Sequence, residues 1–94
     1  MGYYIQCNSN TGKADAICKQ YGAKKVTLNE ATDKINDPAT AIICVVNNGM
    51  FEAAAFCYND RELLEFAEPT DYRPKTFLAM DRRVAKELTG YTGE

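Results

Sequence analysis

Apolar residues run almost without interruption from Ala41 to Tyr58, and only Asn48-Gly49 divides the run. Asn and Gly are the residues that best tolerate the positive φ angles of a two-residue type I′ turn. The pattern therefore predicts an antiparallel hairpin in which Cys44 faces Ala53. Because both surfaces of this hairpin are apolar, we expect it to lie at the centre of a sheet and to be covered on both sides.

A second interpretation of the same run remains open. Three consecutive alanines favour a helix from Met50 onward. Phe51, Ala54 and Tyr58 would then share one helical face. Periodicity alone does not assign so short an apolar run, so the segment is predicted as a strand with a helix as the alternative.

Three elements are expected before the hairpin. Tyr3–Cys7 is rich in residues that favour strands. Lys13–Tyr21 has apolar residues one helical turn apart, and Gly22 is placed to end that helix in a left-handed cap. Ala23–Val26 is a short strand at most.

A second helix is predicted by a capping box. Thr27 and Glu30 have the spacing at which each side chain accepts a hydrogen bond from the other residue's backbone N–H. The helix should run to Ile35 and bury Leu28 and Ala31.

The last third of the chain predicts helix, strand and helix. Asn59 caps a helix that runs to Ala67. Lys75–Met80 reads as a strand. Asp81 caps a final helix over 82–89, in which Val84 and Leu88 should face inward.

The resulting order is β-α-β-(α)-β-β-α-β-α, in a single globular domain over residues 1–94. Crossover helices between strands predict parallel neighbours, and the hairpin adds an antiparallel pair. The expected fold class is α+β, or a small α/β fold, with a mixed sheet, a central antiparallel hairpin and helices packed on the sheet.

The net charge of −2, with both signs interspersed, is too mild for a nucleic-acid mimic and has the wrong sign for a general nucleic-acid binder. No apolar run approaches the roughly 20 residues that span a bilayer, so no membrane association is expected. The four cysteines form no C-x-x-C pair and sit at apolar positions, which is typical of free thiols in a core. These features predict a cytoplasmic protein in a reducing compartment.

The chain contains no histidine. Ser-His-Asp and Cys-His nucleophile pairs are therefore excluded, as are histidine-ligated metals. An enzyme would depend on a tuned carboxylate, lysine, tyrosine or unaided cysteine, and none is recognisable. We therefore predict no catalytic residue, no metal site and no cofactor.

One segment resembles part of a phosphate-binding loop. In CNSNTGKA, residues 7–14, a strand-loop-helix delivers Gly-Lys to a helix N-terminus, where N–H groups, the helix dipole and a lysine can hold phosphate. Cys7 replaces the first glycine and Ala14 replaces the Ser or Thr that binds Mg²⁺, so NTP hydrolysis is not supported. A simpler site for a nucleotide or other phosphate remains open, against the alternative of an ordinary capped helix. Its residues would be Asn8, Ser9, Asn10, Thr11, Gly12 and Lys13.

Glu52 is a carboxylate within the apolar hairpin. If it were buried, its pKa would rise and it could act as an acid or a base. It lies near the turn, however, so we expect solvent to reach it.

The polar loop after Pro69 is a candidate surface for a protein partner. Tyr72, Arg73 and Lys75 lie in it, and Tyr and Arg are enriched in binding hot spots. The alternative is a structural salt bridge from Arg73 to Glu65 or Glu68.

The basic residues of the final helix, Arg82, Arg83 and Lys86, are expected on its solvated face. Arg83 and Glu87 have the spacing of an ion pair.

The C-terminal half, FEAAAFCYNDRELLEFAEPTDYRPKTFLAMDRRVAKELTGY, resembles short uncharacterised proteins of bacteriophage and environmental origin. This resemblance implies action inside a bacterial host cell, through binding of a host component.

The expected function is therefore a non-enzymatic interaction module, either homo-oligomeric or bound to one cellular protein. Binding of a phosphate ligand is the alternative, and an enzyme comes third. Tyr3, Tyr4, Met50 and Phe51 add aromatic and apolar surface that predicts self-association.

Overall fold

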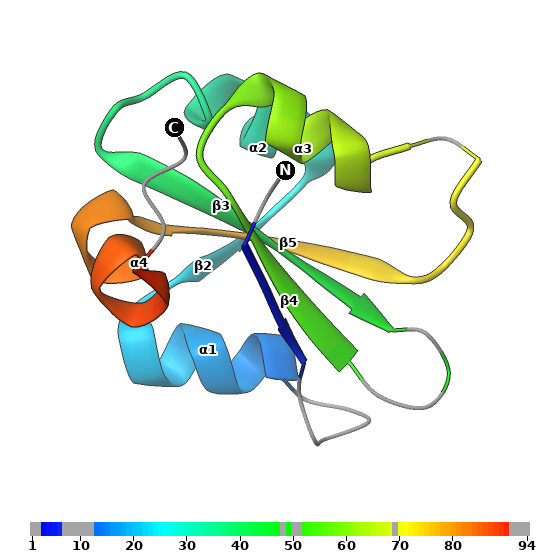
Figure 1. Cartoon of the computed structure of the whole chain (residues 1–94), viewed down its shortest axis with the longest axis horizontal. Helices are drawn as coiled ribbons and strands as arrows, with labels where there is room; N and C mark the ends of the chain where they lie inside the picture. The colour runs from blue at the N-terminus through cyan, green and yellow to red at the C-terminus, as the bar shows by residue number, and fades with distance from the viewer. Residues whose placement is uncertain (1–2, 7–12, 48, 50–51, 69, 91–94) are drawn as a thin grey trace.

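The computed structural model describes residues 3–6, 13–47, 49, 52–68 and 70–90, and these form an α+β fold with the predicted element order. The helices lie on both sides of one sheet (Figure 1). In chain order the elements are β1 (Tyr3–Gln6), α1 (Lys13–Tyr21), β2 (Lys24–Val26), α2 (Leu28–Lys34), β3 (Thr40–Asn47), β4 (Glu52–Cys57), α3 (Asp60–Phe66), β5 (Lys75–Asp81) and α4 (Arg82–Thr89).

The five described strands have the order β1-β4-β3-β5-β2, and each neighbouring pair among them is antiparallel. The predicted parallel neighbours are therefore wrong. The crossover helices do join strands that run in the same direction, but at least one other strand lies between each such pair in the sheet, and three lie between β1 and β2. Thus β3 separates β4 from β5, and β5 separates β2 from β3.

The central hairpin is confirmed, and the helical alternative for its second half is wrong. β4 pairs with β3 on one side and with β1 on the other. The predicted turn is also wrong, because a two-residue Asn48-Gly49 turn requires Asn47 to pair with Met50, whereas Asn47 pairs with Glu52. Cys44 consequently faces Ala55 rather than Ala53. This shift of two residues leaves each side chain on its predicted face, since side chains alternate with a period of two.

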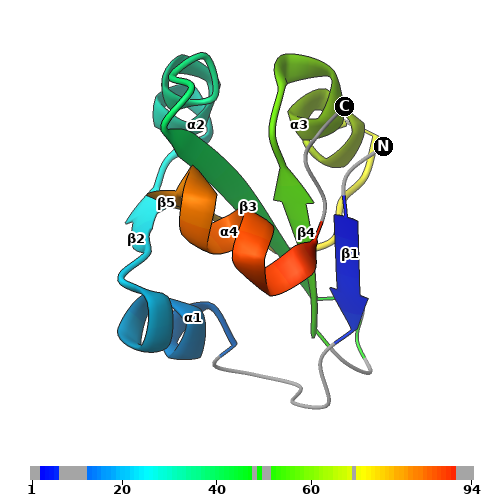
Figure 2. The ribbon, with the colours of Figure 1, turned by 60° about the vertical axis from the view of Figure 1, so that its left-hand side comes forward.

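The two faces of β3 bury different halves of the core. Ile43 and Val45 pack in the cluster that includes Ile17 of α1 and Ala85 of α4. Ile42 packs on the opposite face with Ala31 of α2. α1 and α4 therefore cover one face and α2 and α3 the other, as Figure 2 also shows. The hairpin is central and covered on both sides, as predicted.

Local capping signals set the helix ends. Thr27 and Glu30 form both hydrogen bonds of the predicted capping box, at 3.1 and 3.2 Å. Gly22, the predicted cap of α1, and Gly90, which follows α4, both have positive φ, at 72° and 71°. These turns favour glycine because other residues adopt a positive φ at a cost in free energy.

The inward face of α4 is rotated from the predicted one. Ala85 and Thr89 are buried, whereas Val84 is half-buried and Leu88 is exposed. The Thr89 hydroxyl donates to the Ala85 carbonyl oxygen and shares a 3.0 Å hydrogen bond with the Tyr58 hydroxyl. This buried pair of hydroxyls satisfies polar groups that would otherwise oppose packing of this face.

Candidate functional site

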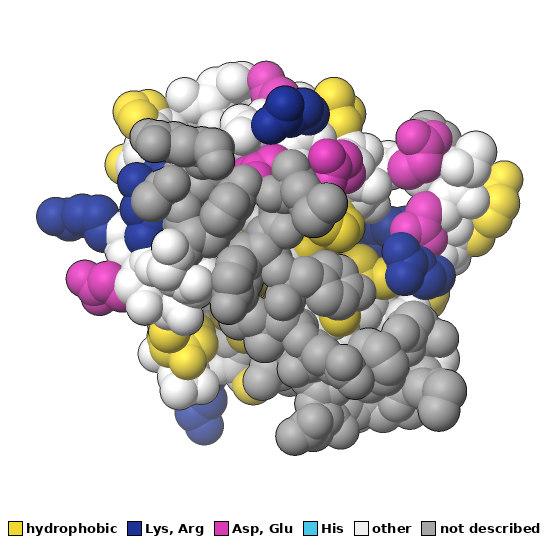
Figure 3. All heavy atoms as spheres, in the orientation of Figure 1, with side chains coloured by type: hydrophobic (Ala, Val, Ile, Leu, Met, Phe, Trp, Pro, Cys, Tyr) yellow, Lys and Arg dark blue, Asp and Glu magenta, His cyan; other side chains and the backbone are white. Residues whose placement is uncertain are grey.

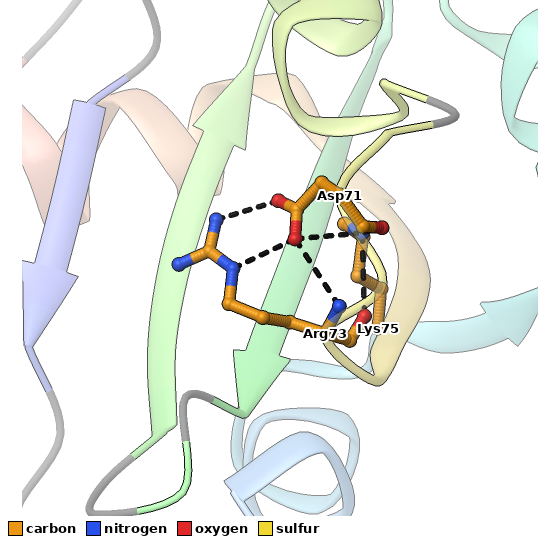
Figure 4. Close-up of polar contacts among 3 residues, drawn as sticks. All are labelled: Asp71, Arg73 and Lys75. Atoms are coloured by element: carbon orange, nitrogen blue, oxygen red, sulfur yellow. Dashed lines mark hydrogen bonds and ion pairs between the residues drawn. The ribbon is translucent and has the colours of Figure 1, made fainter.

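The loop between α3 and β5 is organised around the carboxylate of Asp71 (Figure 4). The Arg73 side chain donates to both carboxylate oxygens, from Nε at 2.8 Å and from Nη2 at 2.6 Å. The backbone N–H of Arg73 also donates to Asp71 Oδ1, at 3.2 Å. Because a planar guanidinium matches a carboxylate in two parallel bonds, this contact fixes direction as well as distance.

Lys75 closes the same loop from the first position of β5. Its ammonium group donates to the carbonyl oxygens of Asp71 at 2.6 Å and of Arg73 at 3.2 Å. It also lies 3.5 Å from Asp71 Oδ1, and the Lys75 side chain is only 10% exposed. The loop is thus held by contacts within residues 71–75 and by attachment to the central sheet.

Tyr72 lies between these anchored residues and is 90% exposed. In Figure 3, hydrophobic, acidic and basic side chains lie together at the right-hand edge of the molecule, where Figure 1 places the segment between α3 and β5. The loop therefore presents an aromatic ring to solvent, and the charges on either side of the ring pair with each other.

The structure brings the predicted residues Tyr72, Arg73 and Lys75 into one loop, but it gives them different roles there. Arg73 and Lys75 use donors to hold the loop, and Tyr72 is the residue presented outward. Asp71, which organises this loop, was not among the predicted binding residues. An Asp followed two residues later by Arg was a usable signal, because Asp side chains commonly bond backbone N–H groups two residues on.

The pKa of Asp71 lies well below its ordinary value, mainly because Arg73 donates hydrogen bonds to the ionised carboxylate. The stabilisation from this pair is complete above the unfolded pKa of about 3.9 and is lost as the pH falls through the lower folded pKa. We expect the NMR signal of the Arg73 side-chain Hε to keep one position as the pH falls through the ordinary carboxyl pKa of about 3.9, and to move towards its unpaired position only well below that pH. Asp71→Asn should place that signal near the unpaired position already at pH 6. An identical Arg73 signal in the variant and the wild type at pH 6 would show that the pair does not form in solution.

The predicted phosphate loop, Asn8 to Gly12, lies outside the described residues, and Lys13 is the first residue of α1. The anion site therefore stays a prediction. Self-association through Tyr3, Tyr4, Met50 and Phe51 also stays a prediction. Met50 and Phe51 lie outside the described residues, and for the two tyrosines only their positions in a strand are described.

Glu52 is buried, contrary to expectation, with 9% of its surface exposed. It occupies the last described pair of the hairpin, opposite Asn47. Residues of α1, β2 and the start of β5, among them Ala14 and Thr76, line the same hollow of about 260 Å³. These neighbouring elements cover Glu52. Its closeness to the turn in the sequence had predicted that solvent would reach it.

Arg82 also departs from its predicted place. Its guanidinium carbon lies 5.3 Å from the centre of the Tyr58 ring, and its Nε is buried. Arg83 is exposed as expected, but its Nε lies 3.8 Å from Asp81 rather than pairing with Glu87.

Three of the four cysteines are described, and all three are free thiols. Burial raises the pKa of Cys44 to about 12, and it raises the pKa of Cys57 as well. These two act as small core residues, as predicted, because a protonated buried thiol is a poor nucleophile. Within the described ranges, no group of three or more Cys, Asp or Glu side chains could hold a metal ion.

Comparison of the chain with protein-family models, with curated proteins and with solved structures finds no match. No helix in the described part of the chain is long and apolar enough to cross a bilayer. A fold class does not by itself assign a function, which depends on the geometry of individual sites.

Proposed function

We propose that this chain is a non-enzymatic interaction module that binds one protein partner through the loop carrying Tyr72. The observation that supports this is a 90% exposed aromatic side chain on a loop fixed by Asp71, Arg73 and Lys75. Binding normally costs free energy because loops and side chains lose freedom at the interface. A loop already ordered by its own hydrogen bonds avoids much of that cost.

The chemistry of the loop also indicates what kind of surface would receive it. A tyrosine ring buries a large apolar area and needs one hydrogen-bond partner for its hydroxyl. Since Asp71 and Arg73 neutralise each other beside the ring, the partner surface needs an apolar pocket with a polar group at its base. Such a pocket is the typical receptor for a tyrosine hot spot.

The partner is one cellular protein, and the resemblance of the C-terminal half points to a bacterial host component. A second copy of the chain is the other form of the same proposal. The three described cysteines are free thiols, which supports a reducing, cytoplasmic setting.

Combined replacement of Tyr72 and Arg73 by Ala should weaken partner binding by about 2 kcal/mol or more, which is roughly a 30-fold loss of affinity. The reason is loss of both the ring and the bidentate contact that orients it. The measurement is quantitative affinity capture with tagged wild type and variant at several protein concentrations, with circular dichroism to establish that both are folded. Sedimentation of the same two proteins reports whether the partner is a second copy.

Leu88→Ala is the matched control, because Leu88 is an exposed large apolar residue on α4, on the other side of the molecule (Figure 1). It should leave binding unchanged. Lys13→Glu tests the alternative function, binding of a nucleotide or other phosphate by residues 8–13, since it reverses the charge there. Loss of binding at Lys13 alone would support the phosphate site. If every folded variant binds as the wild type does, the Tyr72 loop is not the contact surface.

A further inference from the structure

A second candidate site lies where β4 and β5 end, away from the Tyr72 loop (Figure 1). Two hollows adjoin there, with volumes of about 540 and 360 Å³, and Pro38 and Arg82 line both. Asp60 and Arg61 at the start of α3 and Arg82 at the start of α4 line the larger hollow. Ile35 and Tyr58 add apolar surface to it.

Arg82 is held in this place by contacts from two other segments of the chain. Its guanidinium carbon lies 5.3 Å from the Tyr58 ring centre, and its backbone N–H donates to the Ala39 carbonyl oxygen at 2.9 Å. The Tyr58 hydroxyl is in turn bonded to the Thr89 hydroxyl at 3.0 Å. A cation over an aromatic face is attracted by the ring, so the guanidinium has a defined position.

One donor of the Arg82 side chain is nevertheless unsatisfied. Its Nε is buried and has no hydrogen-bond acceptor in the described structure. No carboxylate among the described residues forms an ion pair with it. Buried donors of this kind are rare in folded proteins and usually have an acceptor from protein, water or a ligand.

The charge around the hollows is opposite in sign to that of the whole chain. Basic side chains outnumber acidic ones among the residues that line them, although the net charge of the chain is −2. The charged residues concerned are Arg61, Arg82, Arg83, Lys86, Asp60 and Asp81. Asp81 is already engaged, since its carboxylate accepts from the backbone N–H groups of Arg83 and Val84. Figure 3 shows basic side chains gathered at the left-hand side, over the start of α4.

We propose that the larger hollow binds a small molecule carrying a phosphate group, with the Arg82 guanidinium as the main donor and Arg61 as the second cation. A planar guanidinium suits phosphate oxygens, and an acceptor on a ligand would satisfy the Arg82 Nε, which the described residues leave unpaired. Two arginines lining one hollow match a dianion better than a single carboxylate. The volume leaves room for an organic group beside the phosphate, against Ile35, Pro38 and Tyr58.

The test follows the Arg82 side-chain Hε signal by NMR during titration with inorganic phosphate, adenosine monophosphate and sodium acetate at constant ionic strength. We expect saturable shifts of this signal with both phosphate probes. Adenosine monophosphate should bind at least tenfold tighter than inorganic phosphate, because its organic group occupies the rest of the hollow. Acetate should produce no saturable shift.

Two variants and one control decide how the site is built. Arg82→Lys keeps the charge but removes the planar donors, and it should weaken adenosine monophosphate binding at least tenfold. Arg61→Gln changes an exposed residue, so it should fold normally and weaken binding about threefold to tenfold. Lys19→Gln, an exposed charge on α1, is the control and should change nothing.

The proposal is overturned if no saturable shift appears at Arg82, or if Lys19→Gln weakens binding as much as Arg61→Gln does. Shifts confined to residues 8–13 would also overturn it, because they would place phosphate at the other candidate loop. Should Arg82→Lys fail to fold, the Arg82 signal in the wild type and the Arg61→Gln affinity still decide the matter.

Discussion

Ala54→Asp should destabilise the protein by about 3 kcal/mol or more, because it places an unpaired charge in the core. Ala54 is 2% exposed and lies in the middle of β4, opposite Val45 of β3 and Ile5 of β1. Its face of the sheet is covered by α1 and α4. A domain of this size has a total stability of roughly 5–15 kcal/mol, so the loss would be a large part of it.

Urea unfolding followed by circular dichroism measures this effect. The matched control is Ala16→Asp, which makes the same chemical change at an exposed position of α1 and should lower stability by less than about 1 kcal/mol. If Ala54→Asp unfolded at the same urea concentration as Ala16→Asp, the hairpin would not be covered on both faces.

Glu62→Ala should cost about 2 kcal/mol, although Glu62 is a charged residue type on a short helix. Its side chain is fully buried and accepts a hydrogen bond from the Tyr58 backbone N–H at 2.8 Å. Removing that acceptor leaves a buried N–H unpaired and opens a cavity, and both changes destabilise the fold. The Asn59 cap of the same helix should persist, because its side chain accepts from the backbone N–H of residue 62, which the substitution keeps.

Glu62→Gln is the matched variant, because its amide oxygen can still accept from Tyr58 at nearly the same volume. It should retain most of the stability that the Ala variant loses. Hydrogen exchange gives a second measurement, since the Tyr58 amide should exchange much faster in Glu62→Ala than in Glu62→Gln. Equal exchange rates in the two variants would show that the Glu62 contact does not protect this amide.

Helix ends were the most predictable part of the fold because their causes are local. The bounds of α1 and α4 agree with the sequence prediction, and each has its cap within a few residues. Gly22 ends α1, and Asp81 and Gly90 bracket α4. Such signals need no knowledge of the rest of the chain.

Strand pairing was less predictable, for reasons that lie outside any one segment. The hydrophobic pattern of β3 and β4 is satisfied equally well by two registers that differ by two residues, so it fixed the faces but not the pairs. The crossover helices showed that strands share a direction. The helix pattern does not indicate whether another strand lies between the two strands that a helix joins.

The two candidate sites also differ in how far the sequence predicts them. The Tyr72 loop could be predicted because Asp71, Arg73 and Lys75 are neighbours in sequence as well as in space. Arg82 could not, because residues 82 and 83 are both arginines at the start of one helix and the sequence alone does not tell them apart. Only the contact with Tyr58, 24 positions away, separates the half-buried arginine from the solvated one.

The most direct test of the proposed function is photo-crosslinking from position 72 itself. Replacing Tyr72 with p-benzoylphenylalanine keeps an aromatic ring there and allows it to form a covalent bond to whatever it contacts in living bacterial cells. We expect one dominant adduct, which should weaken when Asp71→Asn is added, and no such adduct from the same probe at Leu88. No adduct at position 72, or the same set of adducts from positions 72 and 88, would contradict the claim that this loop is the contact surface.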